Sequence, residues 1–163
     1  MKKLNMKIST HAAPLAIACA LLASGAPAMA QSDDGVCTNR TLSGDYGFTI
    51  EGVILNPPKG VPIAPGSPLR GVALTHFDGK GNLTQVDHVV VAGLTPEQIG
   101  APHWTPGSGT YQVNPDCTGT AVINIPGNPL APLNLYFVLI KRGKEIHTVV
   151  NANAVTSVGI KIE

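Results

Sequence analysis

The 163-residue sequence predicts an all-β protein, an antiparallel up-and-down β-barrel of about eight strands that follows an N-terminal signal peptide. Apolar and polar residues alternate in short stretches rich in β-branched side chains, and Gly, Pro, Asn and Asp separate these stretches. No apolar period of 3.6 persists over ten or more residues, so helices are not expected. An open sandwich is the alternative, because alternation alone does not show whether a sheet closes.

The first thirty residues have the pattern of a secretory signal peptide. Three lysines form a basic start, an apolar run covers residues 12–23, and Ala28-Met29-Ala30 offers a cleavage site. We expect cleavage after Ala30, a periplasmic or secreted location, and one barrel domain over residues 31–163. The apolar run is shorter than the roughly 20 residues of a membrane span, and no later segment suggests one. Cys19 leaves a lipid anchor as an alternative, although the residues before it resemble a lipoprotein box poorly.

The composition narrows the function classes. Hydrophobic residues make up 44% of the chain, which excludes a disordered protein. Charged residues make up only 13% and their signs nearly balance, so we expect no nucleic-acid partner.

The first half of the barrel domain predicts three strands. Tyr46, Phe48 and Ile50 share one face of the first strand, and Thr49 and Glu51 share the other. A loop with five prolines follows, and then a hairpin whose turn is Asp78-Gly79-Lys80-Gly81-Asn82. The strands are expected at residues 46–55, 69–77 and 83–92, and the proline-rich loop at residues 56–68.

The second half predicts five more strands, after a loop at residues 95–107 that opens with one helical turn. Residues 133–141 are apolar on both faces, which predicts burial on both sides. The strands are expected at residues 109–113, 119–125, 133–141, 145–152 and 154–162.

Two cysteines remain after the leader, Cys37 and Cys117. An exported protein can form disulfides, and a bridge here would close a loop of about 80 residues, worth roughly 4 kcal/mol. A metal pair or a nucleophile is the alternative, but neither cysteine has a CxxC partner or a nearby histidine. We therefore predict a structural disulfide.

Several segments resemble a family of small secreted bacterial β-barrel proteins. The clearest is GTYQVNPDCTGT at residues 109–120; LSGDYGF at residues 42–48, FDGKGNL at residues 77–83 and the final apolar hairpin fit the same pattern. More widely, the chain resembles calycin-type barrels, which are allene oxide cyclase-like or lipocalin-like. The resemblance implies a barrel fold and the handling of a small ligand. It transfers no catalytic residue, and Gly44-Asp45-Tyr46 stands where lipocalins have Gly-x-Trp.

Charged side chains in the first two strands are the candidates for chemistry. Arg70 and His76 share one parity, and Glu51 lies on the first strand; if those faces line the barrel, Glu51 and His76 become catalytic candidates and Arg70 a ligand contact. In the alternative, which we favour, the faces that carry these charged residues are exposed to solvent, and the aromatic residues fill the core.

Three further side chains are candidate ligand contacts. Trp104 lies in a loop between two prolines, where it would sit at a barrel mouth or pack as a cap. Tyr136 and His147 come from the terminal hairpin. Asp87 and His88 are adjacent in a strand and so cannot face one site. The histidines have no HxH or HxxxH spacing, and we predict no metal and no cofactor.

These observations favour an exported, soluble barrel that binds a small apolar ligand. The first alternative is a cyclase or isomerase that acts in the barrel cavity. The second is a structural module with a filled barrel, and self-association into a homo-oligomer stays open.

Overall fold

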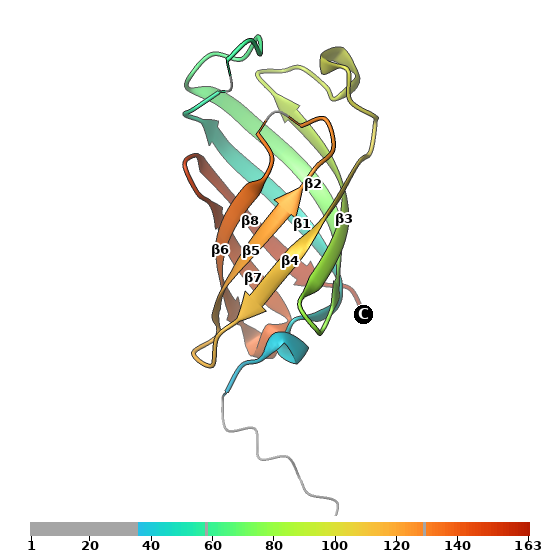
Figure 1. Cartoon of the computed structure of the whole chain (residues 1–163), viewed down its shortest axis with the longest axis vertical. Coiled ribbons are helices and arrows are strands. Elements are labelled where there is room, and N and C mark those ends of the chain that lie inside the picture. Colours follow the sequence, from blue (N-terminus) through green and yellow to red (C-terminus); the bar gives the residue numbers. More distant parts are fainter. Residues whose placement is uncertain (1–35, 58, 129) are drawn as a thin grey trace, which may run out of the picture. The chain divides into compact units, whose positions relative to one another are not determined.

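A computed structural model describes residues 36–57, 59–128 and 130–163. These residues form a closed barrel of eight strands (Figure 1). The predicted signal peptide and Cys19 lie outside the described residues. The strands are β1(Ser43–Ile54), β2(Ser67–Asp78), β3(Asn82–Val91), β4(Thr105–Val113), β5(Thr118–Asn124), β6(Leu133–Ile140), β7(Glu145–Val150) and β8(Ala154–Lys161).

Each strand pairs antiparallel with its neighbour along the chain, and β1 pairs with β8 to close the ring. The predicted up-and-down barrel is therefore confirmed, and the open sandwich is excluded. The hairpin of β2 and β3 has the predicted turn. Asp78 Oδ1 accepts hydrogen bonds from the backbone N–H groups of Lys80, Gly81 and Asn82. Gly79 and Gly81 supply the positive φ values that this turn requires.

The described chain contains three short 3-10 helices. The helix η1(Asn39–Thr41) precedes β1, and η2(Glu97–Ile99) and η3(Lys141–Gly143) lie in the connections before β4 and β7. The helix η2 is the predicted helical turn. The loop that contains it ends earlier than expected, because β4 begins at Thr105 rather than at Gly109. Pro106 and Gly107 conceal the alternation there, since a sheet tolerates them only in special positions.

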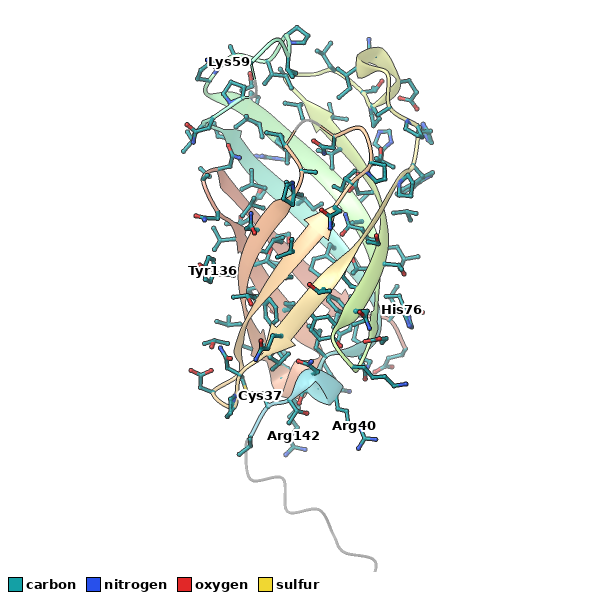
Figure 2. The ribbon with its side chains drawn as sticks, in the orientation of Figure 1. Cys37, Arg40, Lys59, His76, Tyr136 and Arg142 are labelled. Carbon is teal, nitrogen blue, oxygen red and sulfur yellow. A yellow bond between two sulfur atoms is a disulfide. The ribbon has the colours of Figure 1, made fainter. Side chains whose placement is uncertain are left out.

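The prediction that residues 133–141 are buried on both sides is wrong. Burial alternates along β6, and Tyr136 is 57% exposed on the outside of the barrel, where Figure 2 shows it pointing away from the strands. Each strand of a single-layer barrel has only one inner face, so the second apolar row meets solvent.

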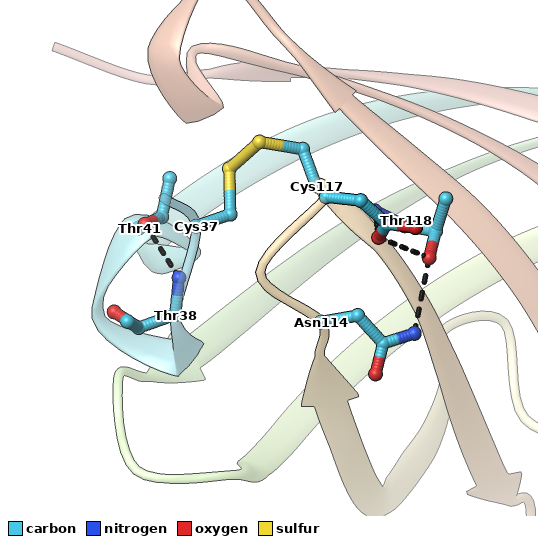
Figure 3. The surroundings of a disulfide bond; sticks show 7 residues. Cys37, Thr38, Thr41, Asn114, Cys117 and Thr118 are labelled. Atoms are coloured by element: carbon cyan, nitrogen blue, oxygen red, sulfur yellow. Dashed lines mark hydrogen bonds between the residues drawn. A yellow bond between two sulfur atoms is a disulfide. The ribbon is translucent and has the colours of Figure 1, made fainter. Parts of the chain in front are cut away.

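The disulfide prediction is confirmed. Cys37 and Cys117 are bonded, with their Cα atoms 4.9 Å apart, and the bond ties the segment before η1 to the turn between β4 and β5 (Figure 3). The backbone N–H of Cys37 also donates to the carbonyl of Pro115 at 3.1 Å. The start of the described chain is thus fixed at one end of the barrel.

The two ends of the barrel differ. Short turns follow β2, β4 and β6, and η1 lies at this same end (Figure 1). The longer connections after β1, β3 and β5 gather at the opposite end, which we call the mouth. No helix in the described part of the chain is long and apolar enough to cross a membrane.

Candidate functional site

The barrel holds a cavity of about 650 Å³. This volume lies within the range of roughly 300–1,000 Å³ that is typical of small-molecule sites. Most of its wall is aliphatic or aromatic, contributed by the inner faces of the strands and by the loops of the mouth. Its apolar strand residues include Phe48, Ile50, Leu69, Val89, Ile123, Leu135, Phe137 and Val150.

Aromatic packing closes the end opposite the mouth. Phe77 lines the cavity and meets Tyr46 and Tyr111 edge-on, with ring centroids 5.4 Å and 5.1 Å away. The Tyr111 hydroxyl donates to the carbonyl of Leu42 at 2.8 Å, and the Tyr46 hydroxyl donates to that of Gly143. Burial raises the pKa of Tyr46 to about 12, with a smaller effect from Tyr111. Both phenols therefore stay neutral and act as a floor.

Hydrogen bonds hold the loops at the mouth. Asn153, in the turn between β7 and β8, accepts from the backbone N–H groups of Leu55 and Asn56 at 3.0 Å and 3.2 Å. On another side, His88 Nδ1 lies 2.7 Å from the carbonyl oxygen of His103. These contacts join the loop after β1 to the β7–β8 turn and the loop before β4 to strand β3, so the loops around the entrance are held in place.

Asp87 is the only ionisable side chain among the described residues that line the cavity. Its place on β3 puts it between Ala73 of β2 and Thr105 of β4, and the residue is only 6% exposed. Gln85 Nε2 donates to Asp87 Oδ2 at 2.9 Å. Loss of solvation raises the pKa of Asp87 to about 6, an effect that the Gln85 hydrogen bond and nearby His88 oppose only in part.

A pair of hydroxyls forms the second polar patch. Thr148 Oγ1 of β7 and Ser157 Oγ of β8 are 2.6 Å apart, and both residues line the cavity. In a ring of eight strands β7 stands opposite β3, so the hydroxyls face the side that carries Asp87. The cavity is therefore apolar with two small polar patches, an arrangement that orients a ligand.

The charged candidates from the sequence lie outside the barrel. The β1–β2 register places Glu51 opposite Arg70, and their charged groups are 3.7 Å apart with both side chains 68% exposed. His76 Nδ1 lies 2.7 Å from Asp45 Oδ1, also in solvent, and Figure 2 shows His76 on the outer surface. None of these side chains lines the cavity. Tyr46, Phe48, Ile50 and Phe77 have the inner positions, as the favoured alternative predicted.

The remaining candidates are also absent from the described cavity wall. Trp104 is 47% exposed and packs near the rings of His88 and His103, 6.0 Å and 6.3 Å away between centroids. Tyr136 faces outward, and His147 Nε2 contacts Glu145 Oε1 at 2.7 Å on the outer face. Among the sequence candidates, the structure shows a direct contact between Glu51 and Arg70, and it places all six outside the cavity wall.

Sequence reasoning missed Asp87 and Gln85 as inner residues, although a signal was present. The predicted turn pairs Phe77 with Leu83, and an inward Phe77 requires an inward Leu83. Parity then turns Gln85 and Asp87 inward as well.

No three His, Cys, Asp or Glu side chains in the described ranges gather in a group that could hold a metal ion. Comparisons of the chain with family models, curated proteins and solved structures found no match.

Proposed function

We propose that the protein is exported and binds one small, mainly apolar ligand inside the barrel. The observation that carries this proposal is the apolar cavity of about 650 Å³ with its fixed mouth. Removing apolar ligand surface from water contributes about 25 cal/mol per Å², which supplies affinity without further polar contacts. The structural alternative needs a filled barrel, and the cavity argues against it.

Export is supported by two features. The first thirty residues have the signal-peptide pattern, and the Cys37–Cys117 disulfide suits an oxidising compartment such as the periplasm. The calycin-like resemblance, with its allene oxide cyclase-like and lipocalin-like branches, agrees with a ligand-binding barrel.

Titration with an uncharged, polarity-sensitive dye tests the proposal. Ala73 and Val72 are consecutive residues of β2 whose side chains lie on opposite faces of the sheet: Ala73 lines the cavity and Val72 is exposed. We expect wild type to bind one dye per barrel, and A73L, which adds side-chain volume inside, to bind it markedly more weakly. V72L adds side-chain volume on the outer face instead, and it should bind the dye as tightly as wild type does.

Melting temperatures of both variants establish that they fold. Equal binding by A73L and V72L would place the dye outside the barrel, and no binding by wild type would reject the proposal.

Catalysis in the same cavity is the second candidate function, and one observation favours it. A buried carboxyl group with a pKa near 6 suits proton transfer at neutral pH, which an isomerase or cyclase needs. Incubation with 2-decanone in D₂O tests this, because a general base would speed deuterium exchange at the carbons beside the carbonyl. Wild type should accelerate the exchange and D87N should not; equal rates would leave binding as the function.

A further inference from the structure

The polar groups that line the cavity favour a ligand of positive charge over one of negative charge. Asp87 is the lone ionisable group of the described wall. The strand register places Ala73 of β2 and Thr105 of β4 opposite Asp87, and Thr75 and Gly107 opposite Gln85. None of these titrates. On its own strand, His88 points to the other side of the sheet.

The cavity therefore contains an acid but no basic side chain among its described residues. Within the described part of the chain, the only hydrogen bond to this carboxylate comes from Gln85. A buried carboxylate normally has a cation or several donors around it, because burial without them is costly. Here the Gln85 amide is the one donor, so the carboxylate oxygens of Asp87 can accept further hydrogen bonds from a bound molecule.

From this geometry we infer that the ligand is an apolar molecule with one protonated amine, which binds the Asp87 carboxylate while its apolar body fills the cavity. The inference rests on the proposed ligand-binding function and adds the ligand class. A charge-assisted N–H···O bond is about twice as strong as a neutral one. A fatty acid would instead bring a second negative charge beside Asp87.

The hydroxyls of Thr148 and Ser157 form the second polar patch of the cavity. They bond to each other across the cavity from Asp87 and bear no charge. A neutral hydroxyl attracts an ammonium group less strongly than a carboxylate does, so the cation is directed to Asp87.

A matched series of ten-carbon probes tests the inference: decylamine, decanol and decanoic acid, each displacing the uncharged dye at pH 7.5. We expect decylamine to bind about tenfold more tightly than decanol, and decanoic acid to bind most weakly. D87N should lose about tenfold in decylamine affinity and keep that for decanol. E51Q makes the same carboxylate-to-amide change on the outer face and should behave like wild type.

A pH series on wild type gives a second reading that does not depend on a variant. An alkylamine stays protonated below pH 9, whereas Asp87 loses its charge as the pH falls through its pKa of about 6. Decylamine affinity should therefore fall about fivefold from pH 8 to pH 5, and decanol affinity should stay constant.

The outcomes separate the two proposals. If decanol binds but decylamine binds no better than decanoic acid, or if D87N and low pH leave decylamine binding unchanged, the inference is wrong and ligand binding stands. If neither the dye nor any of the probes binds, ligand binding itself fails.

Discussion

Asp87→Asn should change how stability depends on pH. The carboxylate lies inside an apolar cavity with one donor, Gln85, so the folded protein favours its protonated form. The unfolded chain exposes the same group to water and gives it an ordinary pKa. Replacing the carboxyl group by an amide of nearly the same shape removes this difference and leaves the packing intact.

The magnitude follows from the pKa. Burial raises the pKa of Asp87 from 3.8 to about 6. Each pKa unit corresponds to about 1.4 kcal/mol, so the shift is worth about 3 kcal/mol. Between these values the folded protein holds the proton and the unfolded chain does not. Rising pH therefore lowers the free energy of unfolding through this window, and the loss is nearly complete at about pH 7.

Other carboxyl groups act in the opposite direction. Hydrogen bonds from Asn82 and from the turn backbone lower the pKa of Asp78, and contacts with Lys141 and His147 lower that of Glu145. These groups stabilise the fold at neutral pH and lose that effect in acid, but both proteins contain them. The difference between wild type and D87N isolates Asp87.

Urea unfolding of both proteins at half-unit steps from pH 4 to pH 8 measures this difference. Relative to D87N, wild type should lose about 2 kcal/mol of unfolding free energy between pH 4 and pH 7, because at pH 4 the unfolded carboxyl group is already partly ionised. E51Q controls for the change in net charge. A wild-type minus D87N difference that stays constant with pH would refute the burial argument for Asp87.

Three further predictions concern other parts of the barrel. Replacing Cys37 and Cys117 together by Ser should lower the free energy of unfolding by about 4 kcal/mol, because the bond closes a loop of 80 residues; chemical denaturation checks this, and an unchanged midpoint would contradict it. Gly119→Ala should cost about 1–3 kcal/mol, because its Cβ would lie 2.2 Å from the Phe137 ring; a melting temperature equal to that of wild type would count against the packing described. Trp104→Phe should leave dye affinity unchanged in the same titration, because Trp104 does not line the cavity, whereas a large loss would place it in the site.

The fold was largely predictable because each local signal agreed with the barrel. The alternation of Tyr46, Phe48 and Ile50 and the Gly-rich turn after Asp78 act over a few residues, and a sequence displays them directly. The start of β4 was not predictable, since Pro106 obscures a pattern that the pairing with β3 restores. The disulfide followed from the small number of cysteines and the expected compartment.

The cavity was less predictable than the fold. Whether an inner face is filled or hollow depends on the sizes of side chains from all eight strands, and no single segment contains that information. The outward-facing side chains of β6 were unpredictable for the same reason. Tyr136 lies in an apolar run that looks buried, and only closure of the barrel shows that its side chain is on the outer face. Asp87 could have been found by extending the hairpin register from Phe77.

Intermolecular NOEs between bound decanol and the methyl groups of the protein test the central claim most directly. Decanol is uncharged, so the result does not depend on the amine preference. Inward methyls of Ile50, Val89 and Val150 should show contacts with the alkyl chain, and the exposed methyls of Val72 and Val138 should show none. Contacts confined to Val72 or Val138, or no contacts at all, would contradict a ligand-binding barrel interior.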